Sequence, residues 1–164
     1  MIRRWSGKAL KFGQPHFPET AAAIEISLTE RLRSGLVDIK ADDAVELFQS
    51  MLRSRPLPSV IDFNNCLVAL PKQKVRYRFR SLKQMEFQGI AYDLYSLNIM
   101  INCFCRLRKL SSAFSVLGKM LKLGYEPDTV TFSTLMNGLC LEGRVSEALT
   151  LVDRMVAMEL TPVS

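Results

Sequence analysis

Residues that commonly carry chemistry are scarce in this sequence of 164 residues. It has one histidine, His16, and four cysteines, none of which forms a CxxC pair. Zinc sites and disulfide frameworks need closely spaced cysteines or histidines, so we expect neither a metal ion nor a disulfide. All four cysteines lie in apolar, helix-like runs, which favours small buried side chains in a reducing compartment.

The motifs of several enzyme classes are also missing. The sequence contains no GxSxG, HExxH, phosphate-binding loop or dinucleotide-binding glycine pattern. Acidic pairs such as Asp42-Asp43 suit the first turn of a helix, where they complement the helix dipole. No run approaches the roughly 18 uninterrupted apolar residues of a membrane-spanning helix. We therefore expect no catalysis, no cofactor and no membrane span.

Acidic residues are absent from the start of the chain, where the first acid is Glu19. Four basic residues precede it, and Ile2, Trp5, Ala9 and Phe12 fall near one helical face. This composition fits a presequence, so we interpret residues 1–24 as a leader that directs the chain to the mitochondrion, with the chloroplast as alternative. An ordinary N-terminus with a chance excess of positive charge is the competing interpretation.

The rest of the positive charge is concentrated in one short stretch, the basic cluster. Its six members are Lys72, Lys74, Arg76, Arg78, Arg80 and Lys83. Removing these and the four basic residues of the leader changes the formal net charge from +6 to −4, so the remainder is not basic. The cluster is either a solvated helix face or a surface that contacts phosphate groups with salt-dependent affinity.

The sequence repeats with a period of about 35 residues. One methionine recurs at spacings of 34, 35 and 35, at Met51, Met85, Met120 and Met155. A small residue recurs at Ala44, Ala113 and Ala148, and a proline at Pro58, Pro127 and Pro162, with Tyr92 in the equivalent place of the second repeat. Four repeats result, 25–59, 60–93, 94–128 and 129–163, of which the first two are degenerate. Such a period is typical of stacked helical hairpins.

Each repeat combines two amphipathic helix patterns. In the last one, Phe132, Leu135, Met136 and Leu139 follow helical spacing, Gly143 offers a left-handed exit, and a second stripe follows at Val145, Ala148, Leu149, Val152, Met155 and Val156. One hairpin cannot bury both stripes alone, whereas stacked hairpins can. The recurring alanines lie where the two helices of a repeat approach most closely, so a larger residue there should force them apart.

The fourth repeat, TVTFSTLMNGLCLEGRVSEALTLVDRMVAMELTPV, resembles the pentatricopeptide repeat. The third matches nearly as well through Asn98, Cys105, Ala113, Gly124 and Asp128, and the first resembles the opening repeat of plant proteins similar to fertility restorers. The resemblance covers about residues 25–164. It implies an all-α fold, a right-handed α-solenoid of stacked helix-turn-helix repeats in the tetratricopeptide-like superfamily. A tetratricopeptide array, with its period of 34 and different glycine pattern, is the nearest rival.

Proteins similar to this family read single-stranded RNA at one base per repeat. In the family, the fifth and last residues of a repeat specify the base and the second packs against its face. Carried over to this sequence, the base-specifying residues are Asn98 with Asp128, Asn64 with Asp93, and Ser133, and the stacking residues are Tyr95, Val130 and Ile61. The basic cluster supplies phosphate contacts under this reading.

The resemblance implies uracil for the third repeat, and for the second with its Asn and Asp. Val163 at the end of the fourth repeat cannot hydrogen-bond through its side chain, and Thr29 lies in a poorly matched helix, so neither repeat receives a base. Helix capping is the alternative role of Asn98 and Asn64, and Asp128 can cap the next helix while still serving RNA.

Three functional hypotheses follow. The first is a non-catalytic, sequence-selective RNA-binding protein that acts on the processing, stability or translation of organellar transcripts. The second is a truncated relative with weak RNA binding or none, in which a homodimer through the exposed end of the fourth repeat compensates for the short array. The third is a protein-binding helical-repeat scaffold, because a fold does not fix a function.

Overall fold

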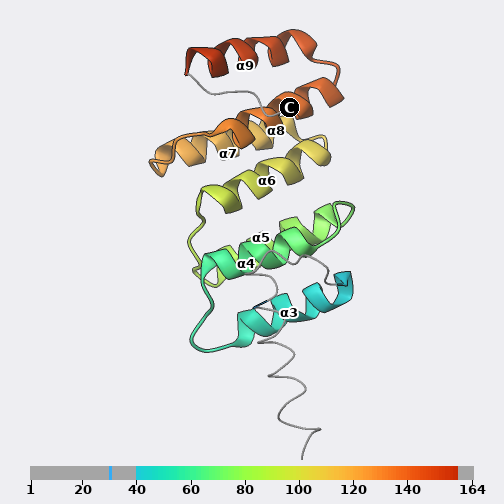
Figure 1. The fold of residues 1–164 in the computed structure, drawn as a ribbon, viewed down its shortest axis with the longest axis vertical. Helices are drawn as coiled ribbons and strands as arrows, with labels where there is room; N and C mark the ends of the chain where they lie inside the picture. Colours follow the sequence, from blue (N-terminus) through green and yellow to red (C-terminus); the bar gives the residue numbers. More distant parts are fainter. Residues whose placement is uncertain (1–29, 31–39, 159–164) are drawn as a thin grey trace, which may run out of the picture. The chain divides into compact units, whose positions relative to one another are not determined.

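The computed structural model describes Glu30 and residues 40–158, and within them it contains only helices and their connections (Figure 1). The leader 1–24 and Val163 lie outside the described residues. The helices are α3 (Ala41–Arg53), α4 (Val60–Ala69), α5 (Val75–Phe87), α6 (Leu94–Arg106), α7 (Leu110–Lys122), α8 (Thr129–Leu141) and α9 (Val145–Ala157). The predicted all-α fold of helical repeats is confirmed.

Three helices start at the first residue of a predicted repeat, and each has a side chain that caps it. Ser59 precedes α4, Asp93 precedes α6 and Asp128 precedes α8, and each accepts a hydrogen bond from the backbone N–H three residues later. Such a cap satisfies a backbone donor that the first turn leaves without a partner. The cap explains why the β-branched run after Asp128 begins a helix rather than a strand.

The exits of the helices are equally regular. Gly89, Gly124 and Gly143 end α5, α7 and α8 with φ angles of +75°, +82° and +74°, so the left-handed exit predicted at Gly143 is confirmed. Arg108, 35 residues before Gly143, has a φ angle of +58° after α6. A side chain is thus held where the other exits use glycine.

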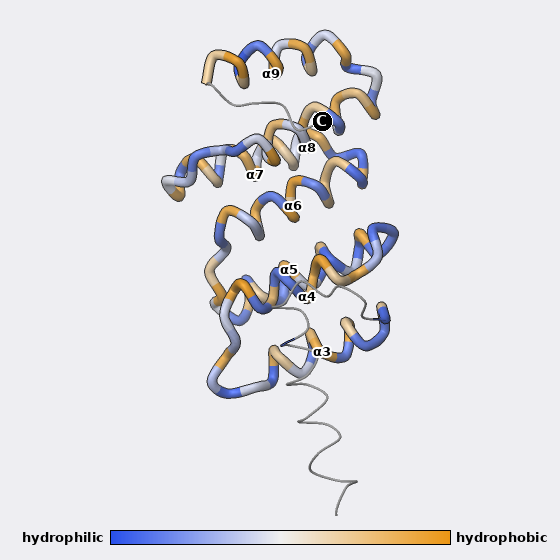
Figure 2. The backbone as a smooth tube through the Cα atoms, viewed as in Figure 1, coloured by the Kyte–Doolittle hydropathy of each residue, from blue (hydrophilic) through white to orange (hydrophobic). Residues whose placement is uncertain are grey.

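The recurring residues of the sequence form the core. Met51, Met85, Met120 and Met155 are buried, and so are the three alanines. Hydrophilic and hydrophobic positions alternate along the helices with helical periodicity (Figure 2). Tyr92, which replaces the recurring proline, is also buried and donates a 2.7 Å hydrogen bond from its hydroxyl to the Leu82 carbonyl oxygen.

The chain divides into two compact units between Leu70 and Pro71. In the N-terminal unit α3 packs on α4, with the rings of Phe48 and Phe63 5.4 Å apart. In the C-terminal unit α6 packs against α5, α7 and α8, and α8 packs against α7 and α9. The division falls inside the second repeat, where Arg78 occupies the place that alanine holds in the other three.

The cysteines follow the prediction with one exception. Cys66, Cys103 and Cys105 are buried, and burial raises the pKa of the Cys103 and Cys105 thiols to about 11. Cys140, in register with Cys105, is exposed, so the prediction is wrong there. Gly138 of α8 packs over Cys105, whereas no described helix covers Cys140 in this way.

The last helix departs from the predicted stripe. Ala148 and Met155 are buried as expected, but the third buried residue of α9 is Leu151, and Val145, Leu149 and Val156 are exposed. The apolar residues of α9 therefore form two neighbouring faces. The buried face packs against α8, and the exposed face is not covered by any described residue.

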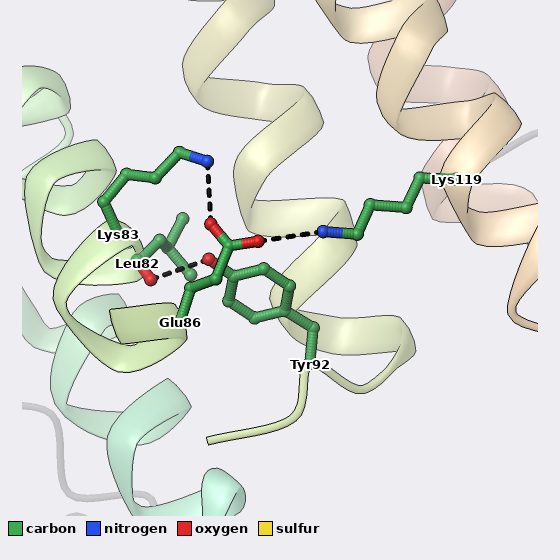
Figure 3. Close-up of polar contacts among 5 residues, drawn as sticks. All are labelled: Leu82, Lys83, Glu86, Tyr92 and Lys119. Carbon is green, nitrogen blue, oxygen red and sulfur yellow. Dashed lines mark hydrogen bonds and ion pairs between the residues drawn. The ribbon is translucent and has the colours of Figure 1, made fainter. Parts of the chain in front are cut away.

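A polar cluster ties α5 to α7 across the α5–α6 connection (Figure 3). The Glu86 carboxylate contacts the ammonium groups of Lys83 at 2.8 Å and Lys119 at 3.0 Å, and Lys119 also lies 5.1 Å from the centre of the Tyr92 ring. Hydrogen bonds from Lys83 and then Lys119 hold the pKa of Glu86 below its usual value. Exposed ion pairs of this kind add little stability.

None of the helices described between residues 40 and 158 has both the length and the apolar character to span a membrane.

Candidate functional site

The third repeat brings its two predicted base-specifying side chains together. The Asn98 amide nitrogen, on α6, donates a 3.1 Å hydrogen bond to Oδ1 of Asp128, which caps α8. The residues are 30 positions apart in the sequence and meet because α6 packs directly on α8. Asn98 is 7% exposed, so only an edge of its amide reaches solvent.

A third side chain, Thr131, completes this contact. Its hydroxyl lies 2.7 Å from Asn98 Oδ1, and both its hydroxyl and its backbone N–H lie within 2.9 Å of Asp128 Oδ1. Burial acts to raise the pKa of Asp128, but the hydrogen bonds from Thr131 and Asn98 outweigh it and leave the pKa below its ordinary value. Asp128 is therefore a carboxylate at neutral pH and only accepts hydrogen bonds.

Capping explains Asp128 but neither asparagine. Asn98 is the fifth residue of α6 and Asn64 the fifth of α4, so both lie inside helices whose caps are Asp93 and Ser59. The interpretation of Asn98 and Asn64 as helix caps is wrong.

The predicted stacking residues are exposed apolar side chains. Tyr95 is 52% and Val130 51% exposed, as the second residues of α6 and α8. Tyr95 lies three residues before Asn98, so the two positions are neighbours on one side of α6. Ile61, the second residue of α4, is 61% exposed.

The predicted pair of the second repeat spans the division of the chain. Asn64 is buried in the N-terminal unit, and Asp93 belongs to the C-terminal unit, where it caps α6. Asp93 Oδ1 accepts hydrogen bonds from the backbone N–H and hydroxyl of Ser96 at 2.7 and 2.8 Å. The Asp93–Ser96 contact therefore repeats the Asp128–Thr131 contact 35 residues earlier.

Ser133 of the fourth repeat differs from Asn98, its counterpart in the third. Its hydroxyl oxygen is buried and has no hydrogen-bond partner among the described residues. The residue predicted to act with it, Val163, lies outside them. The structure thus adds no contact that would assign this repeat a base.

The basic cluster belongs to the C-terminal unit, on α5 and just before it. Its members are exposed apart from Arg78, which is half-buried, and Lys83 is paired with Glu86. Burial lowers the pKa of Arg78, with a further contribution from nearby Arg106. The cluster therefore offers several accessible cations.

Sequence reasoning missed Thr131 and Ser96. Both are completely buried hydroxyl residues three positions after a capping aspartate. The signal was present as Asp93-x-x-Ser96 and Asp128-x-x-Thr131, in register with the repeat. The pattern did not point to a binding site, because the same spacing occurs at the start of many ordinary helices.

Over the described residues, no three side chains of His, Cys, Asp or Glu gather in a way that could hold a metal ion.

Comparison with known proteins identifies the repeat. A model of the PPR repeat family matches residues 92–141, and a model of the PPR repeat matches 130–160. A mitochondrial pentatricopeptide repeat-containing protein of Arabidopsis thaliana is 56% identical, over 77% of this chain and 24% of its own length. A second one from the same plant, also named as mitochondrial, is 58% identical over 62% of this chain and 16% of its length.

Solved structures show the same fold. The pentatricopeptide repeat protein PPR10, crystallised with an 18-nt psaJ RNA element, has a TM-score of 0.61 and 23% identity over 96% of this chain and 23% of its own. The PPR domain of Arabidopsis thaliana protein-only RNase P 1, crystallised with tRNA, has a TM-score of 0.66 and 19% identity over 86% of this chain and 73% of that chain.

The chain thus spans about a quarter or less of the length of these curated relatives, whose names agree with the mitochondrial location expected for it. With the repeat models matched in its C-terminal half and helical hairpins at the predicted period, this chain belongs to the pentatricopeptide repeat family.

Proposed function

We propose that this chain binds single-stranded RNA sequence-selectively and without catalysis, and that it acts on mitochondrial transcripts through their processing, stability or translation. The observation that carries the proposal is the Asn98–Asp128 hydrogen bond beside exposed Tyr95 and Val130. In this arrangement the Asn98 amide can hydrogen-bond to the edge of a base, and the side chains of Tyr95 and Val130 can pack against its face. The RNA-bound relatives PPR10 and RNase P 1 support the same class of partner.

The Asn98 amide retains hydrogen-bonding capacity for a base. One of its two N–H groups is used by Asp128, and one of the two lone pairs of Oδ1 faces Thr131. One donor and one acceptor therefore remain. Uracil presents a carbonyl acceptor next to an N–H donor on its pairing edge, which matches this pair of functions. Stacking on an aromatic side chain such as Tyr95 contributes about 1–3 kcal/mol per base.

We extend the uracil preference to the second repeat through Asn64 and Asp93. Asp93 is held by Ser96 as Asp128 is by Thr131, and Ile61 provides an exposed apolar side chain. Two neighbouring repeats would then read two adjacent uracils. The repeats 25–59 and 129–163 receive no base.

The basic cluster would contact phosphates, through Lys72, Lys74, Arg76 and Arg80 above all, because these side chains are exposed. Each phosphate contact to a single strand releases counterions and adds roughly −0.7 to the slope of log affinity against log salt. A steep slope therefore indicates RNA binding. An affinity that changes with neither salt concentration nor base composition would instead favour an apolar groove, as in a protein-binding scaffold.

The experiment is a titration of the purified chain with ten-nucleotide strands of uracil, cytosine or adenine at several salt concentrations, followed by fluorescence anisotropy. We expect tighter binding to the uracil strand, and a loss of about tenfold in that affinity for Asn98→Ala. Asn137→Ala, which removes an exposed asparagine from α8, is the matched control and should bind like the wild type. A wild-type chain without base preference would refute the proposal.

We also propose a homodimer through the last repeat, because α9 exposes Val145, Leu149 and Val156 along one face. On the equivalent face of α7, Leu110 is buried close to Gly138 of α8 whereas Leu121 is exposed, so a following hairpin covers this face in part. Sedimentation at several concentrations tests this association. Leu149→Glu should keep the chain monomeric, and a wild-type chain that is monomeric at all concentrations would refute the dimer.

A further inference from the structure

Thr131 lies at the centre of the site but cannot touch a base. It is completely buried in the first turn of α8. Its hydroxyl oxygen has four neighbours: Asn98 Oδ1 at 2.7 Å, Asp128 Oδ1 at 2.8 Å, the Asp128 backbone nitrogen at 3.2 Å and Met120 Sδ at 3.9 Å. Whatever Thr131 contributes to recognition must act through Asn98 or Asp128.

The single hydroxyl hydrogen faces two acceptors, Asn98 Oδ1 and Asp128 Oδ1. The Asp128 backbone N–H donates to the hydroxyl oxygen, and Asp128 Oδ1 already accepts from the Thr131 backbone N–H and the Asn98 amide. A carboxylate only accepts, so the amide nitrogen of Asn98 must face it and Oδ1 of Asn98 must face Thr131. Two oxygens this close attract each other only when a hydrogen lies between them, so the Thr131 hydroxyl shares its hydrogen between Asn98 Oδ1 and Asp128 Oδ1 in a three-centre bond that links the two side chains.

We infer that Thr131 is a positioning residue for base selection, which holds the plane of the Asn98 amide so that its remaining donor and acceptor have fixed places. The inference rests on the proposed function. Asp128 alone anchors one end of the amide and leaves rotation about its last bond, whereas a second contact at Oδ1 stops that rotation. A rotating amide presents its donor and acceptor in varying places and discriminates poorly between uracil and cytosine, whose pairing edges differ in donors and acceptors.

The second repeat places a hydroxyl in the same position. Ser96 lies 35 residues before Thr131, is completely buried, and contacts Asp93 Oδ1 at 2.8 Å as Thr131 contacts Asp128. Both repeats with a predicted uracil preference are thus followed by a buried hydroxyl three residues after the capping aspartate. This recurrence makes the hydroxyl part of the expected recognition pattern, along with the asparagine and aspartate.

The test compares Thr131→Val, which keeps the shape and removes the hydroxyl, with Thr131→Ser, which keeps the hydroxyl. The affinity of each for ten-nucleotide uracil and cytosine strands is measured, and helical content is checked by circular dichroism. We expect the uracil-to-cytosine affinity ratio to fall about fivefold in Thr131→Val, the effect of one neutral hydrogen bond, and to stay at its wild-type value in Thr131→Ser. Thr150→Val is the control, because the Thr150 hydroxyl bonds to Ser146 within α9.

The outcomes separate the inference from the proposed function. A wild-type chain without preference for uracil would refute the function. Preference that is lost in Asn98→Ala but fully kept in a folded Thr131→Val would overturn the inference and leave the function standing. If Thr131→Val does not fold, Thr131→Cys takes its place, since its thiol is a weak donor of similar size. The same criterion then applies to its affinity ratio.

Discussion

Gly138 of α8 lies directly against Cys105 of α6, so that a Cβ atom on Gly138 would sit 2.6 Å from the cysteine Sγ. Contacts this short do not occur between real side chains. We expect Gly138→Ala to lower the free energy of unfolding by about 1–3 kcal/mol, the cost of overpacking a core, even though alanine favours helix. Chemical denaturation, monitored by circular dichroism, measures this difference in the free energy of unfolding.

Gly118 of α7 provides the matched control, because a Cβ atom there meets nothing within 4 Å. Gly118→Ala should stabilise the chain by about 0.5–1 kcal/mol through helix propensity alone. Shortening Cys105 to alanine should recover part of the loss in Gly138→Ala. Additive effects of the two substitutions would show that the contact is not the cause.

The left-handed backbone of Arg108 gives a second prediction. A non-glycine residue with this conformation is disfavoured by about 1 kcal/mol, so the free energy of unfolding of Arg108→Gly should exceed that of Arg108→Ala by about 0.5–1 kcal/mol. The Arg108 side chain also donates to the Leu141 carbonyl, and Arg108→Ala isolates the loss of that bond. Gly143→Ala, the reverse change at the equivalent exit, should destabilise. Thermal unfolding of the three variants gives the ranking. Both Arg108 variants lose the bond to Leu141, so an Arg108→Gly chain less stable than Arg108→Ala would contradict the strain.

Tyr92 should stabilise the C-terminal unit through its hydroxyl. Tyr92→Phe removes the 2.7 Å hydrogen bond to Leu82 but keeps the ring beside Lys119, so we expect a loss of about 1 kcal/mol (Figure 3). Tyr125→Phe removes a longer, less buried bond of 3.2 Å to the Tyr92 carbonyl and should cost less. Urea titrations of both variants test which one loses more stability. Equal losses in the free energy of unfolding would show that burial does not determine how much each hydrogen bond contributes.

The Asp128 carboxylate should make stability depend on pH. Because its pKa in the folded chain is below the ordinary value of 3.8, its ionised form stabilises the fold above about pH 4, and this contribution is lost as the pH falls through the folded pKa. Asp128→Asn should therefore be less stable than wild type by about 1 kcal/mol at pH 7, and the difference should shrink at pH 3. Asp153→Asn removes an exposed carboxylate from α9 as control. A difference independent of pH would exclude the charge as its origin.

Regular features of the fold could be predicted because each depends on residues close in the sequence. The start of α8 after Asp128 and the left-handed exit at Gly143 follow from local backbone chemistry, and the methionine period marks the buried stripe. The exposure of Cys140 and Leu149 could not be predicted, because a helix pattern identifies an apolar face without showing which neighbouring helix covers it. The left-handed Arg108 has no local signal at all, since arginine gives no reason to adopt that conformation.

The site was predictable to a similar degree. Family resemblance selected Asn98 and Asp128, and the structure places them in contact. Thr131 was missed because its link to Asn98 joins residues 33 positions apart and shows only after α6 and α8 pack together. The pairing of Lys83 with Glu86, which removes one cation from the basic cluster, also depends on rotamers that sequence spacing does not specify.

The double role of Asp128 constrains how such a chain could be reprogrammed. The same oxygen that receives the Asn98 amide also accepts the Thr131 backbone N–H that starts α8. A substitution designed to change the base read by the third repeat therefore acts on the folding of the fourth. Replacements at this position are limited to side chains that can cap a helix, which are chiefly aspartate, asparagine, serine and threonine.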